Sequence, residues 1–174
     1  SGSWVQSKKM VPNATIPEDF GYNVALSGDT IVSGSHYYAV IFMPDTNGNY
    51  VEKVRRYEFG PWDVAIAGDW IGIVSCTSNP DNAYVTLYNR SGNDWIYNTK
   101  FLYSIGYGIA IAMKDNEMLL GADGYYGFQA KLYNLVNNVW TYSGTTYSGG
   151  GHAVATDGVT YLNTGGSTTS VHRK

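Results

Sequence analysis

The stretch FGYNVALSGDTIVSGS, from Phe20 to Ser35, decides the fold because variants of it return three more times along the chain. The variants are FGPWDVAIAGDWIGIVS from Phe59, IGYGIAIAMKDNEMLLGA from Ile105 and GGGHAVATDGVTYLNTGG from Gly149. An aromatic residue that opens an alternating segment also recurs every 45 or 46 residues, at Trp4, Tyr50, Trp95 and Trp140. Repeats of about 40 to 50 residues rich in short strands predict a propeller or an array whose units bury their cores together.

Each repeat divides into four short alternating segments separated by turn residues, which is typical of one blade of a β-propeller. In the first repeat these segments are Tyr22–Ser27, Thr30–Gly34, Tyr38–Met43 and Tyr50–Arg56. No long segment has apolar residues at helical spacing. We therefore predict an all-β, four-bladed β-propeller with four antiparallel strands per blade. The predicted blades span about 20–56, 59–101, 105–146 and 149–174, the last with residues 4–10 added.

The last repeat has three strand segments, and the missing fourth is expected at the other end of the chain. Residues 4–10 have the same form, an aromatic followed by alternation, as the segments from Tyr50, Trp95 and Trp140. We predict that this N-terminal strand closes the last blade and thereby the ring. Ser1-Gly2-Ser3 is typical of a cloning remnant, so 4–174 is predicted to be a single propeller domain.

The bulk composition argues against several classes of partner. Charged residues make up 14% of the 174, the net charge is −3, and no polybasic run is present, so nucleic acid is not an expected partner. No stretch approaches the ~18 apolar residues of a membrane span, so membrane insertion is not expected. Cys76 is the one cysteine, which excludes an intrachain disulfide.

The repeated phrase resembles the FG-GAP repeats of integrin α-chain propellers, and is most similar to a Trp-containing variant found in microbial and algal proteins. The first copy carries the pattern at Phe20-Gly21, Val24-Ala25 and Gly28-Asp29, and the second copy carries it at equivalent positions. The third copy lacks the Gly-Asp pair, and the fourth keeps little beyond Ala153 and Asp157-Gly158. Integrin propellers usually have seven such repeats, against four here. The resemblance implies a propeller for binding or adhesion and, with it, an extracellular or cell-surface location.

The sequence offers little support for catalysis or a cofactor. No G-x-S-x-G motif or paired-carboxylate arrangement is present, so we do not expect an enzyme. Integrin propellers hold calcium in acidic hairpin loops, and Asp45 begins the best local match, DTNGN. This loop supplies one carboxylate, whereas calcium prefers several acidic oxygen ligands. A plain polar hairpin is favoured there, and calcium is the alternative.

Aromatic residues gather in the loops that join second to third strands and in the links between blades. Tyr and Trp provide rigid contact area with a polar tip, and their rings also stack on sugars. We expect a ligand face formed by Tyr37, Tyr38, Trp62, Tyr125 and Tyr126. The predicted function is a non-catalytic binding or adhesion module for a protein or surface glycan. The alternatives are a sugar-specific lectin and a structural building block of a larger assembly or coat, and part of the aromatic set is expected to pack between blades.

One outer strand lacks the charges that its counterparts carry. Residues 141–147 have no charged side chain, whereas Lys and Arg line the other outer strands. Charges along a strand edge oppose edge-to-edge pairing between chains. The edge formed by Tyr142, Thr145 and Tyr147 is therefore predicted to be the one most prone to self-association.

Overall fold

The structure is a computed structural model of the 174-residue chain. It describes residues 3, 5–6, 8–13, 20–58, 60–76, 82–104, 106–124, 127–149, 151–165 and 168–174. Within these ranges, the side chains of residues 61–62, 104, 106–109, 123–124 and 127–128 are not described.

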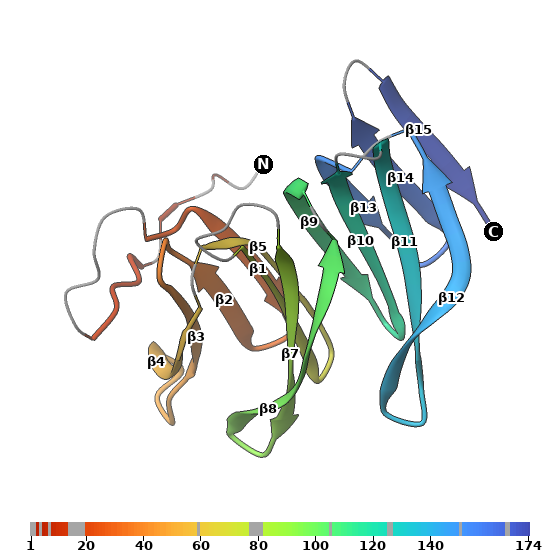
Figure 1. Cartoon of the computed structure of the whole chain (residues 1–174). Coiled ribbons are helices and arrows are strands. Elements are labelled where there is room, and N and C mark those ends of the chain that lie inside the picture. The colour runs from red at the N-terminus through yellow and green to blue at the C-terminus, as the bar shows by residue number, and fades with distance from the viewer. Residues whose placement is uncertain are drawn as a thin grey trace.

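The predicted all-β class is confirmed for the described residues, which form strands arranged in four antiparallel sheets (Figure 1). In each sheet the strands lie side by side in chain order. No helix in the described part is long and apolar enough to cross a membrane. Sheet 1 contains β1 (Asn23–Ser27), β2 (Thr30–Gly34), β3 (Tyr38–Pro44) and β4 (Tyr50–Tyr57); sheet 2 contains β5 (Pro61–Ala67), β6 (Trp70–Cys76), β7 (Ala83–Ser91) and β8 (Asp94–Ser104); sheet 3 contains β9 (Gly106–Lys114), β10 (Glu117–Gly124), β11 (Gly127–Val136) and β12 (Val139–Ser148); sheet 4 contains β13 (Ala153–Thr156), β14 (Thr160–Gly165) and β15 (Thr168–Arg173).

The repeated phrase forms the first hairpin of each sheet. In sheets 1 and 2, Gly28 and Gly68 take positive φ angles of 56° and 54° at the first position of the two-residue turn. Such turns need left-handed backbone, which Gly adopts without steric cost. In sheet 3 the same role falls to Asp115, with a φ of 52°, which explains how this repeat dispenses with the Gly-Asp pair.

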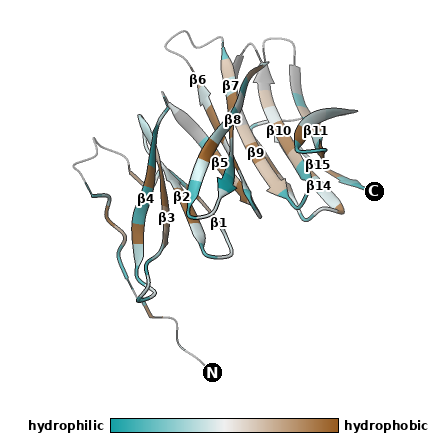
Figure 2. Cartoon of the chain, turned by 90° about the horizontal axis from the view of Figure 1, so that it is seen from below, coloured by the Kyte–Doolittle hydropathy of each residue, from teal (hydrophilic) through white to brown (hydrophobic). Residues whose placement is uncertain are grey.

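The four sheets follow one another in a row, with sheet 1 at one end and sheet 4 at the other (Figure 2). Neighbouring sheets pack chiefly through their first strands, β1 on β5, β5 on β9 and β9 on β13, while the outer strands β4 and β8 barely touch. The row therefore fans out around an axis on the side of the first strands.

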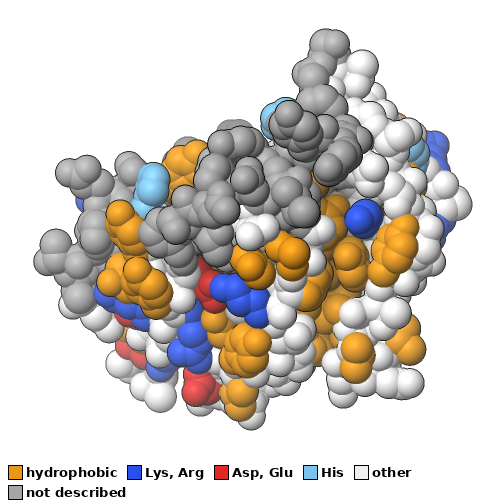
Figure 3. Space-filling model, in the orientation of Figure 1, with side chains coloured by type: hydrophobic (Ala, Val, Ile, Leu, Met, Phe, Trp, Pro, Cys, Tyr) orange, Lys and Arg blue, Asp and Glu red, His pale blue; other side chains and the backbone are white. Residues whose placement is uncertain are grey.

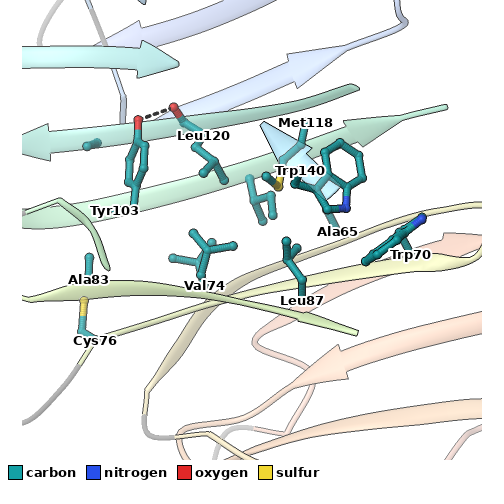
Figure 4. Close-up of a cluster of buried hydrophobic side chains, with 13 residues drawn as sticks. Ala65, Trp70, Val74, Cys76, Ala83, Leu87, Tyr103, Met118, Leu120 and Trp140 are labelled. Atoms are coloured by element: carbon teal, nitrogen blue, oxygen red, sulfur yellow. Dashed lines mark hydrogen bonds between the residues drawn. The ribbon is translucent and has the colours of Figure 1, made fainter. Parts of the chain in front are cut away.

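The core lies between the sheets, and outer-strand tryptophans fill the wedges where the sheets diverge. Trp95 of β8 is fully buried against sheet 1. Trp140 of β12 meets Trp70 of sheet 2 edge to face, with ring centroids 5.8 Å apart (Figure 4). In the same cluster, the hydroxyl of Tyr103 donates a 2.6 Å hydrogen bond to the backbone oxygen of Leu120 (Figure 4). Trp95 and Trp140 thus each pack their sheet onto the preceding one.

The expected closure by the N-terminal strand is wrong for the described residues. Sheet 4 has three strands, and no strand is formed by the described part of residues 4–10. That part lies against the opposite end of the row, where the Lys8 ammonium donates to the backbone oxygen of Tyr50 (3.3 Å) and the Asn13 N–H donates to the Glu52 carboxylate (2.7 Å). The physical reason is that sheet 4 packs on sheet 3, at the opposite end of the row from sheet 1 (Figure 1), so a segment that lies on β4 is distant from β15 of the same chain.

Candidate functional site

Exposed and half-buried aromatic residues of sheet 1 gather where its β2–β3 loop meets the link to sheet 2. We call this set the aromatic surface. It consists of Tyr22, His36, Tyr37, Tyr38 and Tyr57.

The loop beneath this surface is held by hydrogen bonds to its backbone. The Ser35 hydroxyl oxygen accepts the N–H groups of Tyr37 (3.4 Å) and Tyr38 (3.1 Å), a local turn typical of serine. The backbone oxygens of His36 and Tyr37 accept the N–H groups of Gly60 (2.8 Å) and Glu58 (3.0 Å), respectively. The two loops therefore form one hydrogen-bonded platform.

The rings on this platform contact one another edge to face or tilted. The His36 ring lies 6.2 Å from Tyr22 and 6.3 Å from Tyr37, and the Tyr38 ring lies 5.5 Å from its cross-strand partner Tyr57. Tyr22 and Tyr57 are about two-thirds exposed, at 64% and 67%. The surface therefore presents exposed aromatic side chains to solvent on a support of paired strands.

A basic side chain borders the aromatic surface. The Arg55 guanidinium lies 5.5 Å from the centroid of the Tyr38 ring, within cation–π range, and donates two hydrogen bonds of 2.8 Å to the Glu52 carboxylate. This pairing lowers the pKa of Glu52. Lys and Arg side chains are interspersed with hydrophobic ones over the region of β4 and β8 (Figure 3). The surroundings thus offer both apolar contact and charged hydrogen-bond donors.

A buried carboxylate ties this end of sheet 1 to sheet 2. Glu58 accepts hydrogen bonds from the Tyr88 hydroxyl (3.0 Å) and the Lys100 ammonium (3.2 Å). Burial and the nearby Glu58 raise the pKa of Tyr88 well above its usual value. Because its partners come from the neighbouring sheet, this group positions the platform.

The other carboxylate and thiol groups with shifted pKa values serve packing. Asp63 accepts the backbone N–H groups of Val64 and Ile111, both at 2.9 Å, and so links β5 to β9, while burial raises its pKa. Cys76 is a buried free thiol whose pKa is also raised by burial. Among the described residues, no three His, Cys, Asp or Glu side chains converge as metal ligands would.

The predicted calcium loop forms a hydrogen-bonded hairpin turn. One carboxylate oxygen of Asp45 accepts the N–H groups of Asn47 and Asn49, both at 2.8 Å. These bonds lower the pKa of Asp45. Such self-capping is the ordinary role of an aspartate at a turn.

The structure brings two of the five predicted ligand residues together, Tyr37 and Tyr38. The side chain of Trp62 in β5 is not described, and Tyr125 and Tyr126 also lie outside the described part of the chain. Sequence reasoning missed Tyr22 as a site residue. Tyr22 precedes β1 and comes to lie beside His36 only when β1 pairs with β2, so no local sequence signal marks it.

The three residues of the predicted self-association edge have different surroundings in the structure. Tyr142 is exposed on β12 and its hydroxyl lies 2.6 Å from that of Thr146, while Thr145 is half-buried on the same strand. Tyr147 instead stacks on Tyr161 (5.7 Å) and His172 (4.3 Å) of sheet 4. Tyr147 thus packs between sheets, and self-association through this edge stays a prediction.

Comparison with known proteins supports the fold and leaves the family open. No family model and no curated protein matches the chain. Among solved structures, the chain is similar to the crystal structure of the computationally designed Ika4 protein, with a TM-score of 0.59 over 97% of this chain and 99% of that chain. The two sequences are 14% identical. At that identity the likeness concerns the arrangement of repeated sheets alone.

Proposed function

We propose that each sheet is a blade of an FG-GAP-like propeller and that the chain is a non-catalytic binding or adhesion module at the cell surface or outside the cell. Its ligand, a protein or a surface glycan, would bind at the aromatic surface. The observation that carries this proposal is the exposure of Tyr22 and Tyr57 on a platform whose backbone is fixed by hydrogen bonds.

The physical basis is that exposing aromatic rings to water is unfavourable in free energy, and covering them with a ligand is favourable. Tyrosine buries a large area on binding and loses few rotamers, so it is common among residues that dominate binding energy. On this platform the rings are already ordered by their mutual contacts and by the Ser35 turn. Pre-ordering lowers the entropy lost on binding.

A glycan-array screen with and without calcium tests the proposal. Selective binding that Tyr37→Ala or Tyr57→Ala weakens about tenfold, the loss of roughly 1.4 kcal/mol of contact, would support a glycan site. Tyr97→Ala is the matched control, because Tyr97 is 56% exposed on β8, outside the aromatic surface.

Three results would redirect the proposal. Equal losses with Tyr97→Ala and Tyr57→Ala would move the site away from the aromatic surface. Calcium dependence would return attention to the Asp45 loop. A blank array would exclude the glycan alternative for the sugars tested and leave a protein ligand.

A further inference from the structure

The two ends of the row expose apolar positions whose counterparts are buried at the junction of sheets 1 and 2. The head face is the side of sheet 1 directed away from sheet 2, where Val24, Leu26 and Ile31 lie on β1 and β2. On the β3 part of the same side, Phe42 is buried within the single chain and its ring lies 6.0 Å from that of Phe20. The tail face is the side of sheet 4 directed away from sheet 3, where Ala155, Leu162 and Val171 lie in one cross-strand row.

The head face can be compared with the corresponding side of sheet 2. Aligned on their first turns, Val24 and Leu26 occupy the positions of Val64 and Ile66. Val64 and Ile66 pack against sheet 1 and are 4% and 7% exposed. Val24 and Leu26 are 63% and 72% exposed. The same repeat position is thus a core residue in one sheet and a surface residue in the other.

The tail face shows the same relation in the other direction. The row Ala155–Leu162–Val171 corresponds to the row Ala25–Val32–Ile41, which faces sheet 2. Val32 and Ile41 are fully buried there, whereas Leu162 is half-buried and Val171 is 59% exposed. The tail face therefore has the pattern of a surface that packs on a following sheet.

The fan gives these two faces a geometry in which they can meet. A heterologous contact, in which one end of a unit binds the opposite end of the next, closes into a ring when the rotation allows. β1 and β13 are not among the first-strand pairs that pack within the chain. Propellers typically have four to eight blades, so two copies of four sheets reach the upper size and three copies exceed it.

The N-terminal segment lies where a second copy would arrive. The described residues Lys8 and Asn13 contact β4 at the head end. Sheet 4 has β15 as its last strand and lacks the fourth strand that sheets 1 to 3 possess. Residues 4–10 have the sequence pattern of that fourth strand.

We propose that two copies of this chain close a ring head to tail, with the head face of each covering the tail face of the other and residues 8–10 of each pairing with β15 of the other. In each contact, Val24 and Leu26 would pack as Val64 and Ile66 pack on sheet 1. One partner, a second copy of the chain, would cover the exposed apolar row and pair with the open edge of β15.

The proposal does not rest on the proposed function. Tyr57 of the aromatic surface stays accessible in such a ring, whereas Tyr22 lies beside β1 and borders the head face. The position of Tyr57 in sheet 1 is that of Leu102 in sheet 2. Leu102 is 50% exposed although sheet 2 has neighbours on both sides. A variant that loses glycan or protein binding while its mass stays unchanged would therefore test the binding site. A variant whose mass changes while binding is kept would test the ring.

Sedimentation equilibrium on the full chain, over micromolar to near-millimolar concentrations, tests the proposal. We expect twice the chain mass of 19.1 kDa for the unchanged protein. Val24→Glu and Val171→Glu should each reduce the mass to that of one chain, because each places a charge in one half of the contact. Val136→Glu is the matched control, since Val136 is 53% exposed at the end of β11, on neither face. It should leave the mass doubled.

Several outcomes would overturn the head-to-tail ring. One is a single-chain mass for the unchanged protein at every concentration, and another is a mass that keeps growing with concentration. A third is loss of the dimer with Val24→Glu but not with Val171→Glu, which would indicate head-to-head pairing. Loss of the dimer with Thr145→Lys and not with the face variants would assign association to the β12 edge instead. Near-ultraviolet circular dichroism checks that the variants fold, which is expected because both valines are exposed in the single chain.

The strand-pairing part has its own test. Proline lacks a backbone N–H and fits poorly within a paired strand. Lys9→Pro should weaken dimerisation about tenfold relative to Lys9→Ala, through one lost ladder hydrogen bond and the local distortion. Equal dimerisation by the two variants would overturn the pairing of residues 8–10 with β15.

Discussion

Sheet 2 and sheet 4 are built from the same repeat, yet their second strands differ in burial. β6, with sequence WIGIVSC, is buried at every position because sheets 1 and 3 cover both of its faces. β14, with sequence TYLNTG, alternates between half-buried and buried positions because sheet 3 covers one face. Strands buried on both faces have nearly continuous apolar sequences, and strands buried on one face alternate. The place of a sheet in the row, more than its repeat, decides how much its residues contribute to stability.

The largest expected effect comes from shortening one leucine in each sheet, on the side directed towards the following sheet. Leu87→Ala removes a fully buried side chain of sheet 2 and should lower the free energy of unfolding by about 2–5 kcal/mol. Leu162→Ala, in sheet 4, should cost about 1 kcal/mol or less, because Leu162 is half-buried in a single chain. Urea denaturation of both variants in the Val24→Glu background, which keeps the ends uncovered, makes this comparison. Equal losses would show that the tail face is already covered within one chain.

A second, smaller contrast concerns the glycines at the junctions. A Cβ at Gly121 would lie 2.6 Å from the backbone oxygen of Gly151, so Gly121→Ala should force sheets 3 and 4 apart and cost about 1–3 kcal/mol. At Gly72 the Cβ would instead meet the side-chain ends of Ile111 and Met113, which can move. Gly72→Ala should therefore destabilise less than Gly121→Ala. A reversal of that order in thermal unfolding would contradict the described junction.

The smallest expected effect is a pH dependence at the junction of sheets 1 and 2. Arg90 donates to both carboxylate oxygens of Asp29 (3.0 and 3.1 Å), which lowers the pKa of Asp29 in the folded state. A lowered folded-state pKa gives stability that is present above the unfolded pKa and is lost as the pH falls through the folded one. Asp29→Asn should thus cost less than about 1 kcal/mol at neutral pH, because the pair is partly exposed. The difference in unfolding free energy between Asp29→Asn and the unchanged chain should disappear in acid.

Unfolding free energies from urea titrations between neutral pH and pH ~3 measure this difference. Asp157→Asn is the control from sheet 4, because Asp157 accepts N–H groups of its own turn, Val159 and Thr160, and bridges no junction. A pH-independent gap between the unchanged chain and Asp29→Asn would contradict the assigned pairing.

The hairpins were predictable from the sequence, and the closure was not. The predicted segment Thr30–Gly34 coincides with β2, because alternation and the flanking Gly-Asp turn both mark its ends. Residues 4–10 were assigned to the last sheet by counting strands. A count ignores the angle between sheets, which is set by how closely β1, β5, β9 and β13 pack. That packing depends on side chains distant in sequence.

The candidate site was predictable only in part for a related reason. Tyr37 and Tyr38 were found because they stand in a loop next to each other. Tyr22 joins them only through the fold, since β1 pairs with β2 and places it beside His36. The sequence did not predict that the charged residue Glu58 is buried, because its partners Tyr88 and Lys100 are 30 and 42 residues away in the chain.

The chain-order arrangement of strands within every sheet has a consequence for folding. Each strand pairs with a strand that immediately precedes or follows it in the chain, so no strand pairing joins distant repeats and the contact order stays low for an all-β chain. Cooperativity then arises from nearest-neighbour coupling between sheets, as in a one-dimensional array. In the Val24→Glu chain, whose ends are uncovered, amide hydrogen exchange should be slowest in sheets 2 and 3, which have neighbours on both sides, and fastest in the terminal sheets, from which unfolding spreads inward.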